Sequence, residues 1–499
     1  DRVTSEFFKN APLIFFEHVL SLVNYIYDSG ETPISFSKAI IFPLFKRGDP
    51  TDVANYRGIS CLDAVSKIFT GLLLRRLEVF VEENNLLGEF QAGFRRGYST
   101  FDNLFTLLNI VNLKFLKKGN KLFCFFVDFR AAFDHINHQS LYLKLFNIGV
   151  SSKFINCLKS LYSNSSAAVR GSSGISEYFR VQGGLRQGCL LSPLLFSLFL
   201  DDLPAFLDGG VLVGGTSVKV LMYVDDVVLL VDNPVSLQRN IDKLSTYCDL
   251  WNLSVNTDKS KVLVFRRGGR LASKEKWYFK GQRLEVVNQF NYLGVMLTPR
   301  LSFKRHLAEK VSVGKRAVNG VWSGFFSQNL VPLPFKFQLF NSVCRSVVSY
   351  AAQVWGFQRY EELEKFQRFF IKKLFSLPTA TPNYMVYIET GVDLLMVYTL
   401  KLHFKYCLKV FNLPSHRLPR ITALEIIKKK TSWFKSWIDL AQKYSCQFDC
   451  SIDSISEWKN QLLALVNRIK AAHRGECVLR STVSAHFLLY KELDQFQHV

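Results

Sequence analysis

Two adjacent carboxylates, Asp225 and Asp226, stand in the middle of an apolar, strand-like run over residues 218–231. Burying both charges would be costly unless a cation met them. A tight turn between two short strands would present both carboxylates at one edge, where a divalent metal ion is their natural partner. The alternative is an ordinary hairpin whose two aspartates face solvent, and this segment alone does not decide between the two.

A third carboxylate, Asp128, ends another apolar run over residues 122–129. Two separate strands could therefore each bring carboxylates to one rim, and a trio of this kind can hold two metal ions. Two-metal sites hold both the attacking and the leaving oxygen of a phosphoryl transfer. A single Asp at the end of a strand is more often a cap or turn residue, but the Asp-Asp pair and a basic chain favour the catalytic interpretation.

The elements that must position these carboxylates are of mixed type. Apolar periodicity predicts helices over residues 5–27, 64–84, 99–114, 139–146, 152–162, 192–203, 233–252 and most of the chain from 303 onward. Strands are expected over residues 39–42, 122–129, 262–265 and 289–297. Helices and strands do not alternate as in a doubly wound sheet, so the expected class is α+β.

The composition describes a folded, strongly basic protein. The chain has 499 residues, 48% of them hydrophobic, and a formal net charge of +22. This length allows two to four domains, and the charge points to a polyanion, nucleic acid ahead of an anionic membrane. Ten scattered cysteines fit a reduced, intracellular compartment. Residues 12–27 have the pattern of an amphipathic helix and not of a membrane span. The chain begins at Asp1 without Met, so we expect that it could be a fragment of a longer protein.

Eight sequence blocks resemble, in order, the reverse transcriptase of non-LTR (LINE-type) retrotransposons, closest to the jockey-like elements. The blocks lie at residues 1–9, 55–60, 91–100, 126–134, 184–196, 223–226, 256–261 and 290–294, with a further similar segment at 349–356. A lone Tyr-Val-Asp-Asp would be weak, but eight blocks in the family's order are specific. The resemblance covers most of residues 1–400.

This resemblance implies a right-hand polymerase fold with fingers, palm and thumb and a mostly helical C-terminal extension. Residues 1–35 would be a helical lead-in, 36–298 the fingers and palm, 299–415 a helical thumb, and 416–499 a basic region of uncertain fold. Asp128 and Asp225 would be the main ligands of two Mg²⁺ ions, with Mn²⁺ as a substitute, and Asp226 a weaker or structural ligand. Lys259 resembles the lysine that protonates departing pyrophosphate, although an exposed Lys without a catalytic role fits the sequence nearly as well.

Further residues are assigned by the resemblance to the nucleotide and the primer. The expected nucleotide-binding residues are Lys46 and Arg57 for the triphosphate, Phe133 under the sugar, and Arg186, Gln187 and Gly188 beside the nascent base pair. A bulky Phe133 would leave no room for a 2′-hydroxyl and would select dNTPs. The expected primer grip comprises Phe290, Tyr292, Leu293 and Gly294. The sequence departs from the family at Gly58, Ala131 and Leu190, and Ala131 replaces a common Lys beside the metal site.

The C-terminal region leaves two questions open. Three lysines at 428–430 precede Trp433, Phe434 and Trp437, a mixture typical either of a single-strand binder or of an amphipathic helix that packs its aromatics inward. Cysteine and histidine side chains of types suited to zinc also occur here, at Cys446, Cys450, His473 and Cys477. The long gap between the two pairs argues against zinc.

The expected function is an RNA-directed DNA polymerase that works by target-primed reverse transcription. Its partners would be template RNA, a DNA primer in target DNA and dNTPs, with no membrane, and an endonuclease upstream in the chain or on another protein. It would act in a cytoplasmic ribonucleoprotein and in the nucleus. The alternatives are a group II intron-type reverse transcriptase with maturase function, and a co-opted, inactive RNA-binding protein that retains the fold.

Overall fold

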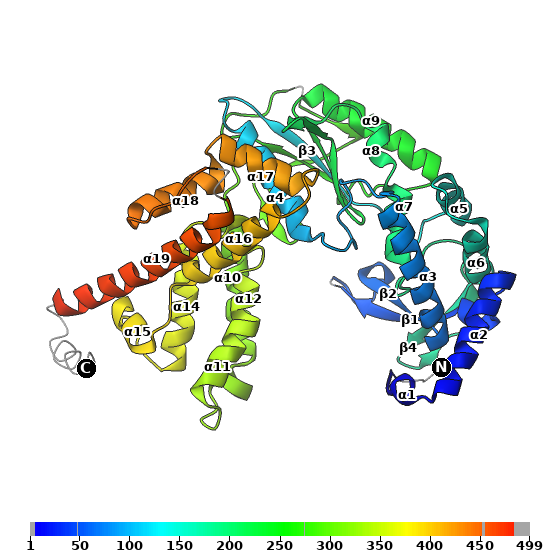
Figure 1. The fold of residues 1–499 in the computed structure, drawn as a ribbon, viewed down its shortest axis with the longest axis horizontal. Coiled ribbons are helices and arrows are strands. Elements are labelled where there is room, and N and C mark those ends of the chain that lie inside the picture. The colour runs from blue at the N-terminus through cyan, green and yellow to red at the C-terminus, as the bar shows by residue number, and fades with distance from the viewer. Residues whose placement is uncertain (1–4, 47, 274, 452–454, 484–499) are drawn as a thin grey trace.

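The computed structural model describes residues 5–46, 48–273, 275–451 and 455–483. Residues 1–4 of the expected lead-in and 484–499 of the C-terminal region lie outside the described residues. The chain forms an arch, with the N-terminal helices and one five-stranded sheet at one foot, a second five-stranded sheet near the top, and the C-terminal helices at the other foot (Figure 1). This arrangement matches the expected right-hand polymerase fold.

The N-terminal foot of the arch contains the described part of the expected helical lead-in, residues 1–35, followed by the part of the chain expected to form the fingers. Its helices are α1 (Ser5–Asn10), α2 (Leu13–Ser29), η1 (Ile34–Ser37), η2 (Val53–Asn55) and α3 (Ala64–Glu83). Its strands are β1 (Lys38–Phe45), β2 (Tyr56–Cys61), β4 (Ser166–Gly171), β5 (Gly174–Ile175) and β6 (Phe179–Arg180). β1 pairs with β2 in the antiparallel sense and with β4 in the parallel sense. Helix α3 starts where the Asp63 carboxylate accepts the backbone N–H groups of Val65 and Ser66, an N-cap of the usual kind.

The top of the arch is the palm, built on a five-stranded sheet in the order β14-β11-β3-β10-β9. These strands are β3 (Leu122–Val127), β9 (Val220–Tyr223), β10 (Asp226–Val231), β11 (Lys261–Phe265) and β14 (Val286–Val287). The other palm strands form hairpins: β7 (Val211–Val213) with β8 (Thr216–Val218), β12 (Tyr278–Phe279) with β13 (Gln282–Arg283), and β15 (Phe290–Tyr292) with β16 (Val295–Leu297). The surrounding helices are α4 (Thr100–Lys114), α5 (His138–Asn147), α6 (Ser152–Ser163), α7 (Ser192–Leu200), α8 (Leu203–Phe206) and α9 (Pro234–Trp251).

The palm sheet separates two hydrophobic cores. All six residues of β3 are buried. Because successive side chains of a strand point to opposite faces, Cys124 and Phe126 enter one core and Phe123 and Phe125 the other. A strand buried on both faces reads as a continuous apolar run, which explains why residues 122–129 show no alternation.

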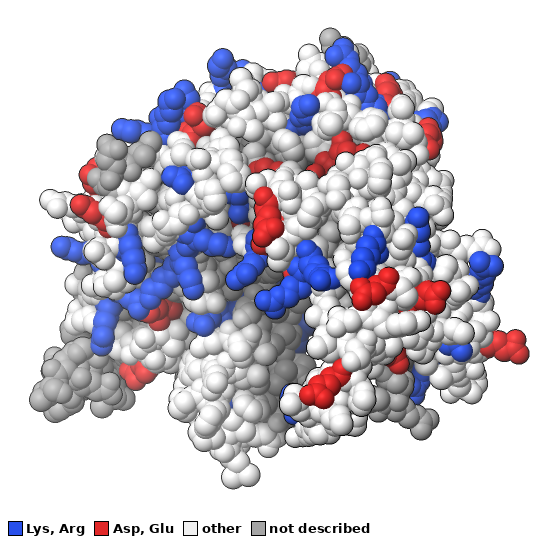
Figure 2. Space-filling view, turned by 45° about the vertical axis from the view of Figure 1, so that its right-hand side comes forward, with Lys and Arg blue, Asp and Glu red and all other residues white. Residues whose placement is uncertain are grey.

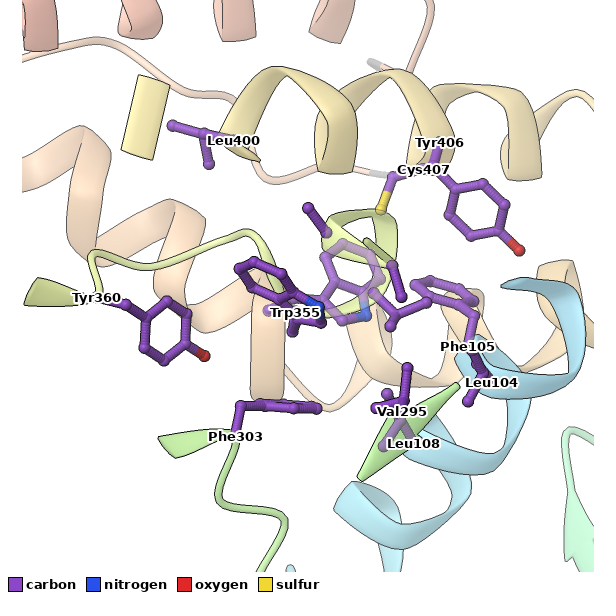
Figure 3. Close-up of a cluster of buried hydrophobic side chains, with 14 of the residues drawn as sticks. Leu104, Phe105, Leu108, Val295, Phe303, Trp355, Tyr360, Leu400, Tyr406 and Cys407 are labelled. Carbon is purple, nitrogen blue, oxygen red and sulfur yellow. The ribbon is translucent and has the colours of Figure 1, made fainter. Parts of the chain in front are cut away.

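The second foot of the arch is entirely helical. Its elements are α10 (Lys304–Gly320), η3 (Trp322–Phe326), α11 (Leu333–Leu339), η4 (Phe340–Arg345), α12 (Ser346–Val348), α13 (Ala352–Trp355), α14 (Glu361–Leu374), α15 (Asn383–Thr390), α16 (Leu395–Phe411), α17 (Leu418–Lys428), α18 (Ser432–Lys443) and α19 (Ile455–Val483). One core runs from the palm sheet through these helices, and Trp355, Phe105, Val295 and Cys407 meet inside it (Figure 3). The palm, the thumb and the C-terminal region therefore share a core.

The structure resolves one open question of the C-terminal region. Trp433, Phe434 and Trp437 on α18 are all buried, and their rings pack against Trp458 of α19 or against one another. The amphipathic-helix alternative is therefore the correct one, and these rings are not available to stack on bases. No helix among the described residues combines the length and the apolarity needed to cross a membrane.

Candidate active site

The three candidate carboxylates lie at one edge of the palm sheet. Val224 and Asp225 form the turn between β9 and β10, and Asp226 is the first residue of β10. Asp128 directly follows β3, whose last residue, Val127, stands opposite Val227 of β10. Because β3 and β10 are antiparallel, the end of one strand meets the start of the other. The register thus brings Asp128 beside Asp226, as the two apolar runs predicted.

The three carboxylates are close enough to perturb one another's charge. Burial, followed by the charges of Asp225 and Asp128, raises the pKa of Asp226 to about 6. Burial also raises the pKa of Asp128, and the charge of Asp225 adds to this while Lys259 and Lys46 oppose it. For Asp225, burial raises the pKa against its own backbone N–H and the charges of Arg57 and Lys46. Like charges held together in this way favour a cation between them.

These donors fit a hard divalent cation. Within the described residues, no group of three or more His, Cys, Asp or Glu side chains could hold a metal ion as the side chains stand. Mg²⁺ does not require such a closed set, because it takes one or two carboxylates and completes its octahedron with water and substrate phosphate oxygens. Three carboxylates of raised pKa at one sheet edge suit that mode of binding.

Three exposed cations face the carboxylates. Lys46 follows β1, and its backbone N–H donates to the carbonyl of Asn55 at 2.8 Å. Arg57 on β2 stands opposite Leu44 of β1, so the same hairpin carries both cations. Lys259 approaches from the segment before β11. On the face shown in Figure 2, Lys and Arg side chains form a band above a hollow in the surface. The structure thus brings Lys46, Arg57 and Lys259 to the carboxylates.

The loop that holds Gln187 and Gly188 lies against β2. The backbone N–H of Ser60 donates to the carbonyl of Gln187 at 2.6 Å. Gly188 has a φ of +126°, and a Cβ there would lie 2.4 Å from the Ser60 carbonyl oxygen. Only glycine fits this conformation and this approach. The Gln187 side chain donates to the Asp134 carboxylate at 3.2 Å, so its amide nitrogen already has a partner within the protein.

Arg186 is held by the protein. Its guanidinium donates to the carbonyls of Phe36 and Leu161, both at 2.6 Å, and to the Ser165 hydroxyl at 2.7 Å. These bonds join the loop to η1 and to the C-terminal end of α6. Its contact with a nucleotide stays a prediction, and in this structure the side chain anchors the loop.

Phe133 follows Asp128 by five residues and is half-buried. Its ring stacks on Phe196 with centroids 4.6 Å apart and planes 12° apart. Its carbonyl accepts the N–H of Leu185 at 2.7 Å. The stack fixes the ring plane while leaving part of the ring exposed, which suits the predicted contact with a sugar. Ala131, the departure from the family, adopts a left-handed φ of +41° beside it.

The predicted primer grip is a hairpin clamped by the thumb. Leu293 and Gly294 both have positive φ and form the two-residue turn between β15 and β16, while Phe290 stacks on Phe126 with centroids 4.3 Å apart. Tyr350 donates its hydroxyl to the Leu293 carbonyl at 2.9 Å, and a Cβ at Gly294 would lie 2.8 Å from its ring. Tyr292 is buried beneath the hairpin.

The candidate zinc residues lie away from the carboxylates. Cys446 and Cys450 follow α18, and both are partly buried. His473 and Cys477 are one turn apart on α19, with Nε2 and Sγ 3.7 Å apart. The His473 ring also packs edge-on against Tyr387 with centroids 4.7 Å apart. The structure therefore places His473 and Cys477 in a packed helical interface.

Two supporting residues carry no role in the sequence-based prediction. Ser260, fully buried, accepts the N–H of Asp128 on its hydroxyl at 2.9 Å. The Asn256 N–H donates to the Asp128 carbonyl at 2.8 Å, so the block at 256–261 holds the carboxylate in place. Gln91, also fully buried, accepts a hydrogen bond from the Val224 N–H on its side-chain oxygen. The sequence signals for Ser260 were its place in the block at 256–261 and its position at the border of an apolar strand.

Comparisons with known proteins identify the family of this chain. The family described as reverse transcriptase (RNA-dependent DNA polymerase) matches residues 46–297, about half of the chain. A probable RNA-directed DNA polymerase from the X-element transposon of Drosophila melanogaster is 27% identical over 345 residues, covering 67% of this chain and 37% of that protein. The RNA-directed DNA polymerase of the mobile element jockey from Drosophila funebris is 27% identical over 378 residues, covering 74% and 40%. The chain thus spans about two fifths of the length of these relatives.

Among solved structures, telomerase from Candida tropicalis in complex with an RNA fragment has a TM-score of 0.41 at 15% identity, covering 82% of this chain and 67% of that one. The apo form of the same enzyme also has a TM-score of 0.41, at 13% identity, covering 83% and 74%. Together, the ordered blocks, the carboxylates at the palm edge and the match over residues 46–297 show that this chain belongs to the reverse transcriptase (RNA-dependent DNA polymerase) family, in its non-LTR retrotransposon branch.

Proposed function

We propose that this chain is an RNA-directed DNA polymerase that extends a DNA primer along an RNA template. The observation that carries the proposal is the meeting of Asp128, from the end of β3, with Asp225 and Asp226, from the β9–β10 turn. Two strands distant in sequence deliver three carboxylates to one edge, opposite Lys46, Arg57 and Lys259.

The proposed reaction forms a bond between the primer 3′-oxygen and the α-phosphorus of a dNTP and breaks the bond to the β-phosphate oxygen. Two bound Mg²⁺ ions would supply electrostatic stabilisation of the attacking and leaving oxygens, with Mn²⁺ as a substitute. Asp128 and Asp225 would be the main ligands and Asp226 a weaker one. The 3′-hydroxyl proton leaves to solvent, and pyrophosphate departs.

The remaining site residues act on the substrate. Lys46 and Arg57 would grip the triphosphate, since Arg suits bidentate phosphate contact. Lys259 would give a proton to the departing pyrophosphate. Phe133, fixed by its stack on Phe196, would exclude a 2′-hydroxyl and so favour dNTPs. Together these roles complete a nucleotidyl transfer.

The partners follow from charge and family. A net charge of +22 and the band of cations in Figure 2 suit a template–primer duplex bound through its phosphates. The template would be the RNA of the element itself and the primer a nick in target DNA. An endonuclease in another part of the protein or on a separate chain would make that nick, and the polymerase would act in a cytoplasmic ribonucleoprotein and in the nucleus.

Primer extension tests the proposal. The assay takes the purified chain, an RNA template, a DNA primer, dNTPs and Mg²⁺, with Asp225→Asn as the test variant. Loss of a carboxylate that holds the metal is expected to lower the extension rate about 10³-fold or more. Asp249→Asn is the matched control, because Asp249 is an exposed aspartate paired with Lys280 on the surface.

Two outcomes would contradict the proposal. Equal extension by the wild type and Asp225→Asn would show that the polymerising activity does not use this site. An absence of extension by the wild type, with RNA binding retained, would favour the co-opted RNA-binding protein. Addition of excess chelator should stop extension, and restoring Mg²⁺ should recover it.

A further inference from the structure

We infer that Gln91 and Arg417 are positioning residues for the catalytic turn, and that through them the C-terminal helical region is part of the frame of the active site. The inference rests on the proposed function, since it concerns the carboxylates of that same site. Arg417 lies 120 residues beyond the end of the family match at residue 297. No role for either residue follows from the matched domain alone.

The catalytic turn needs external support. Val224, between Tyr223 and Asp225, has a φ of +61°. A β-branched residue disfavours this left-handed conformation, which persists only where surrounding contacts impose it. The conformation matters for the site because Val224 immediately precedes the two carboxylates.

Gln91 supplies the main contact. Its side chain is fully buried, and its Oε1 accepts the N–H of Val224 at 3.0 Å and the N–H of Gly93 at 2.9 Å. Two N–H donors to one oxygen fix the orientation of the amide. Gly93 is equally constrained, because a Cβ there would lie 2.5 Å from the Val224 nitrogen.

The segment around Gln91 is also hydrogen-bonded to the edge strand of the palm sheet, β9. The Met222 N–H donates to the Phe90 carbonyl at 2.8 Å, and the Ala92 N–H donates to the Met222 carbonyl at 2.9 Å. Residues 90–92 thus lie beside β9 through an isolated parallel bridge between Gln91 and Met222. A shift of this segment would move β9 and the turn together.

Arg417, just before α17, holds this segment from the other side. Its side chain is 5% exposed, and Nε donates to the Glu89 carboxylate at 2.8 Å. Nη2 donates to the Asp102 carboxylate of α4, also at 2.8 Å. The guanidinium lies 3.4 Å from the centre of the Tyr98 ring, and the Tyr98 hydroxyl donates to Glu89 at 2.7 Å. Every one of these partners lies in residues 89–102.

The C-terminal helices add a second contact to the same cluster. Tyr406 of α16 donates its hydroxyl to Asp102 at 2.7 Å, and the Leu418 N–H donates to Glu89 at 3.1 Å. Removing Arg417 would leave the buried Asp102 and the mostly buried Glu89 without their cation, a strongly unfavourable state. The path runs from Arg417 through Glu89 and Gln91 to Val224 and the carboxylates.

The test compares Gln91→Met and Arg417→Met with the matched control Gln367→Met, a buried glutamine in the thumb helix α14. Met matches the length of glutamine and removes its hydrogen bonds; at Arg417 it keeps an apolar stem but removes both the hydrogen bonds and the charge. In both test variants, kcat for primer extension is expected to fall about 10- to 100-fold while KM for dNTP changes less than about 3-fold, because the carboxylates are displaced and the cations that bind substrate are not. The control should keep the wild-type kcat.

Hydrogen exchange gives a readout that does not depend on activity. Backbone amides of residues 220–228 should exchange about 10-fold faster in both test variants, whereas those of α10 should not change. Gln91→Glu, which keeps the acceptor oxygen, should lie between the wild type and Gln91→Met. If Arg417→Met exposes amides throughout the chain, Arg417→Lys, which keeps the charge but not the two-point contact, replaces it.

The outcomes separate this inference from the proposed function. Unchanged exchange over residues 220–228 in either test variant, or a fall in kcat equalled by Gln367→Met, would overturn the inference. If the wild type extends no primer, the proposed function fails, and the exchange of residues 220–228 still decides whether Gln91 and Arg417 hold the turn.

Discussion

At the scale of single residues, the site depends on close backbone approaches as much as on charged groups. Gly188 has no side chain, and its backbone lies against the Ser60 carbonyl in a conformation that disfavours any Cβ. This contact lets the loop at 186–188 lie flat against the fingers hairpin. The hairpin carries Arg57 and leads to Lys46. The close contact at Gly188 therefore helps to set the position of the two cations that would hold the triphosphate.

Replacing Gly188 with alanine should therefore impair nucleotide use. The added Cβ would lie 2.4 Å from the Ser60 oxygen and push the loop away from β2. We expect kcat/KM for dNTP incorporation to fall at least about 10-fold, measured by single-nucleotide extension. Gly174→Ala is the matched control, because Gly174 has a similar φ of +134° with open space around it. Equal losses in both variants would contradict the role of the Ser60 contact.

The sequence predicted part of this site for identifiable reasons. Asp128, Asp225 and Asp226 were predictable because a carboxylate at the end of a buried apolar strand must meet water or a cation at the edge of the sheet. The bonds of Arg186 to backbone carbonyls and a hydroxyl of the protein were not, because a charged residue beside a glycine loop has the same local sequence whether it meets substrate or backbone. The role of Gln91 was equally hidden, because the block at 91–100 includes this residue but does not reveal a hydrogen bond to a residue 133 positions away.

At the scale of elements, helix α16 carries a buried histidine inside the shared core. His403 donates from Nδ1 to the Gln353 carbonyl at 2.7 Å, and its Nε2 lies 3.6 Å from the Cys407 sulfur. Burial lowers the pKa of His403 to about 4, with the Gln353 carbonyl opposing it. The folded protein therefore keeps this imidazole neutral where the unfolded chain would be protonated.

This histidine should make the fold sensitive to acid. Between pH 6.5 and 4 the unfolded state binds the extra proton, so the free energy of unfolding falls as the pH drops through that range. Between pH 7 and pH 5, we expect the free energy of unfolding to decrease by about 2 kcal/mol less in His403→Gln than in the wild type. Chemical denaturation at several pH values measures this. The same difference in His18→Gln, an exposed control on α2, would contradict the assignment.

Element positions were predictable where periodicity is strong. The helix expected over 64–84 is observed at Ala64–Glu83, and the one expected over 99–114 at Thr100–Lys114. The strand expected over 289–297 is instead a hairpin, because the residues Leu293 and Gly294 turn the chain with positive φ. A leucine in that conformation gives little local signal, and only the contact with Tyr350 of the thumb explains it.

At the scale of the whole molecule, two features stand out: the net positive charge, and the hydrophobic core that the palm shares with the C-terminal helices. The net charge of +22 predicts binding that depends on phosphate contacts. The core that joins the palm to the C-terminal helices could not be predicted from sequence, because the apolar faces of α4, α16 and α18 do not reveal which faces they meet. Only tertiary contacts, such as the bond between Asn109 and Trp433 at 3.0 Å, assign them.

The charge gives a direct prediction for binding. The affinity for an RNA–DNA template–primer should fall about 10²-fold or more between 50 and 200 mM salt, with a linear relation between the logarithms of affinity and salt concentration. Fluorescence anisotropy with a labelled primer measures the slope. An affinity that hardly responds to salt would contradict binding through phosphates and would require contacts of another kind.

The division of β3 between two cores has a consequence in genetic terms. Cys124 and Phe126 serve one core, Phe123 and Phe125 serve the other, and Asp128 follows in the same alternation. A missense change in this strand alters one side chain and one core. Insertion or deletion of a single codon would exchange the side chains of both cores and turn the carboxylate away from Asp226. The gene should therefore tolerate substitutions here far better than any change in codon number.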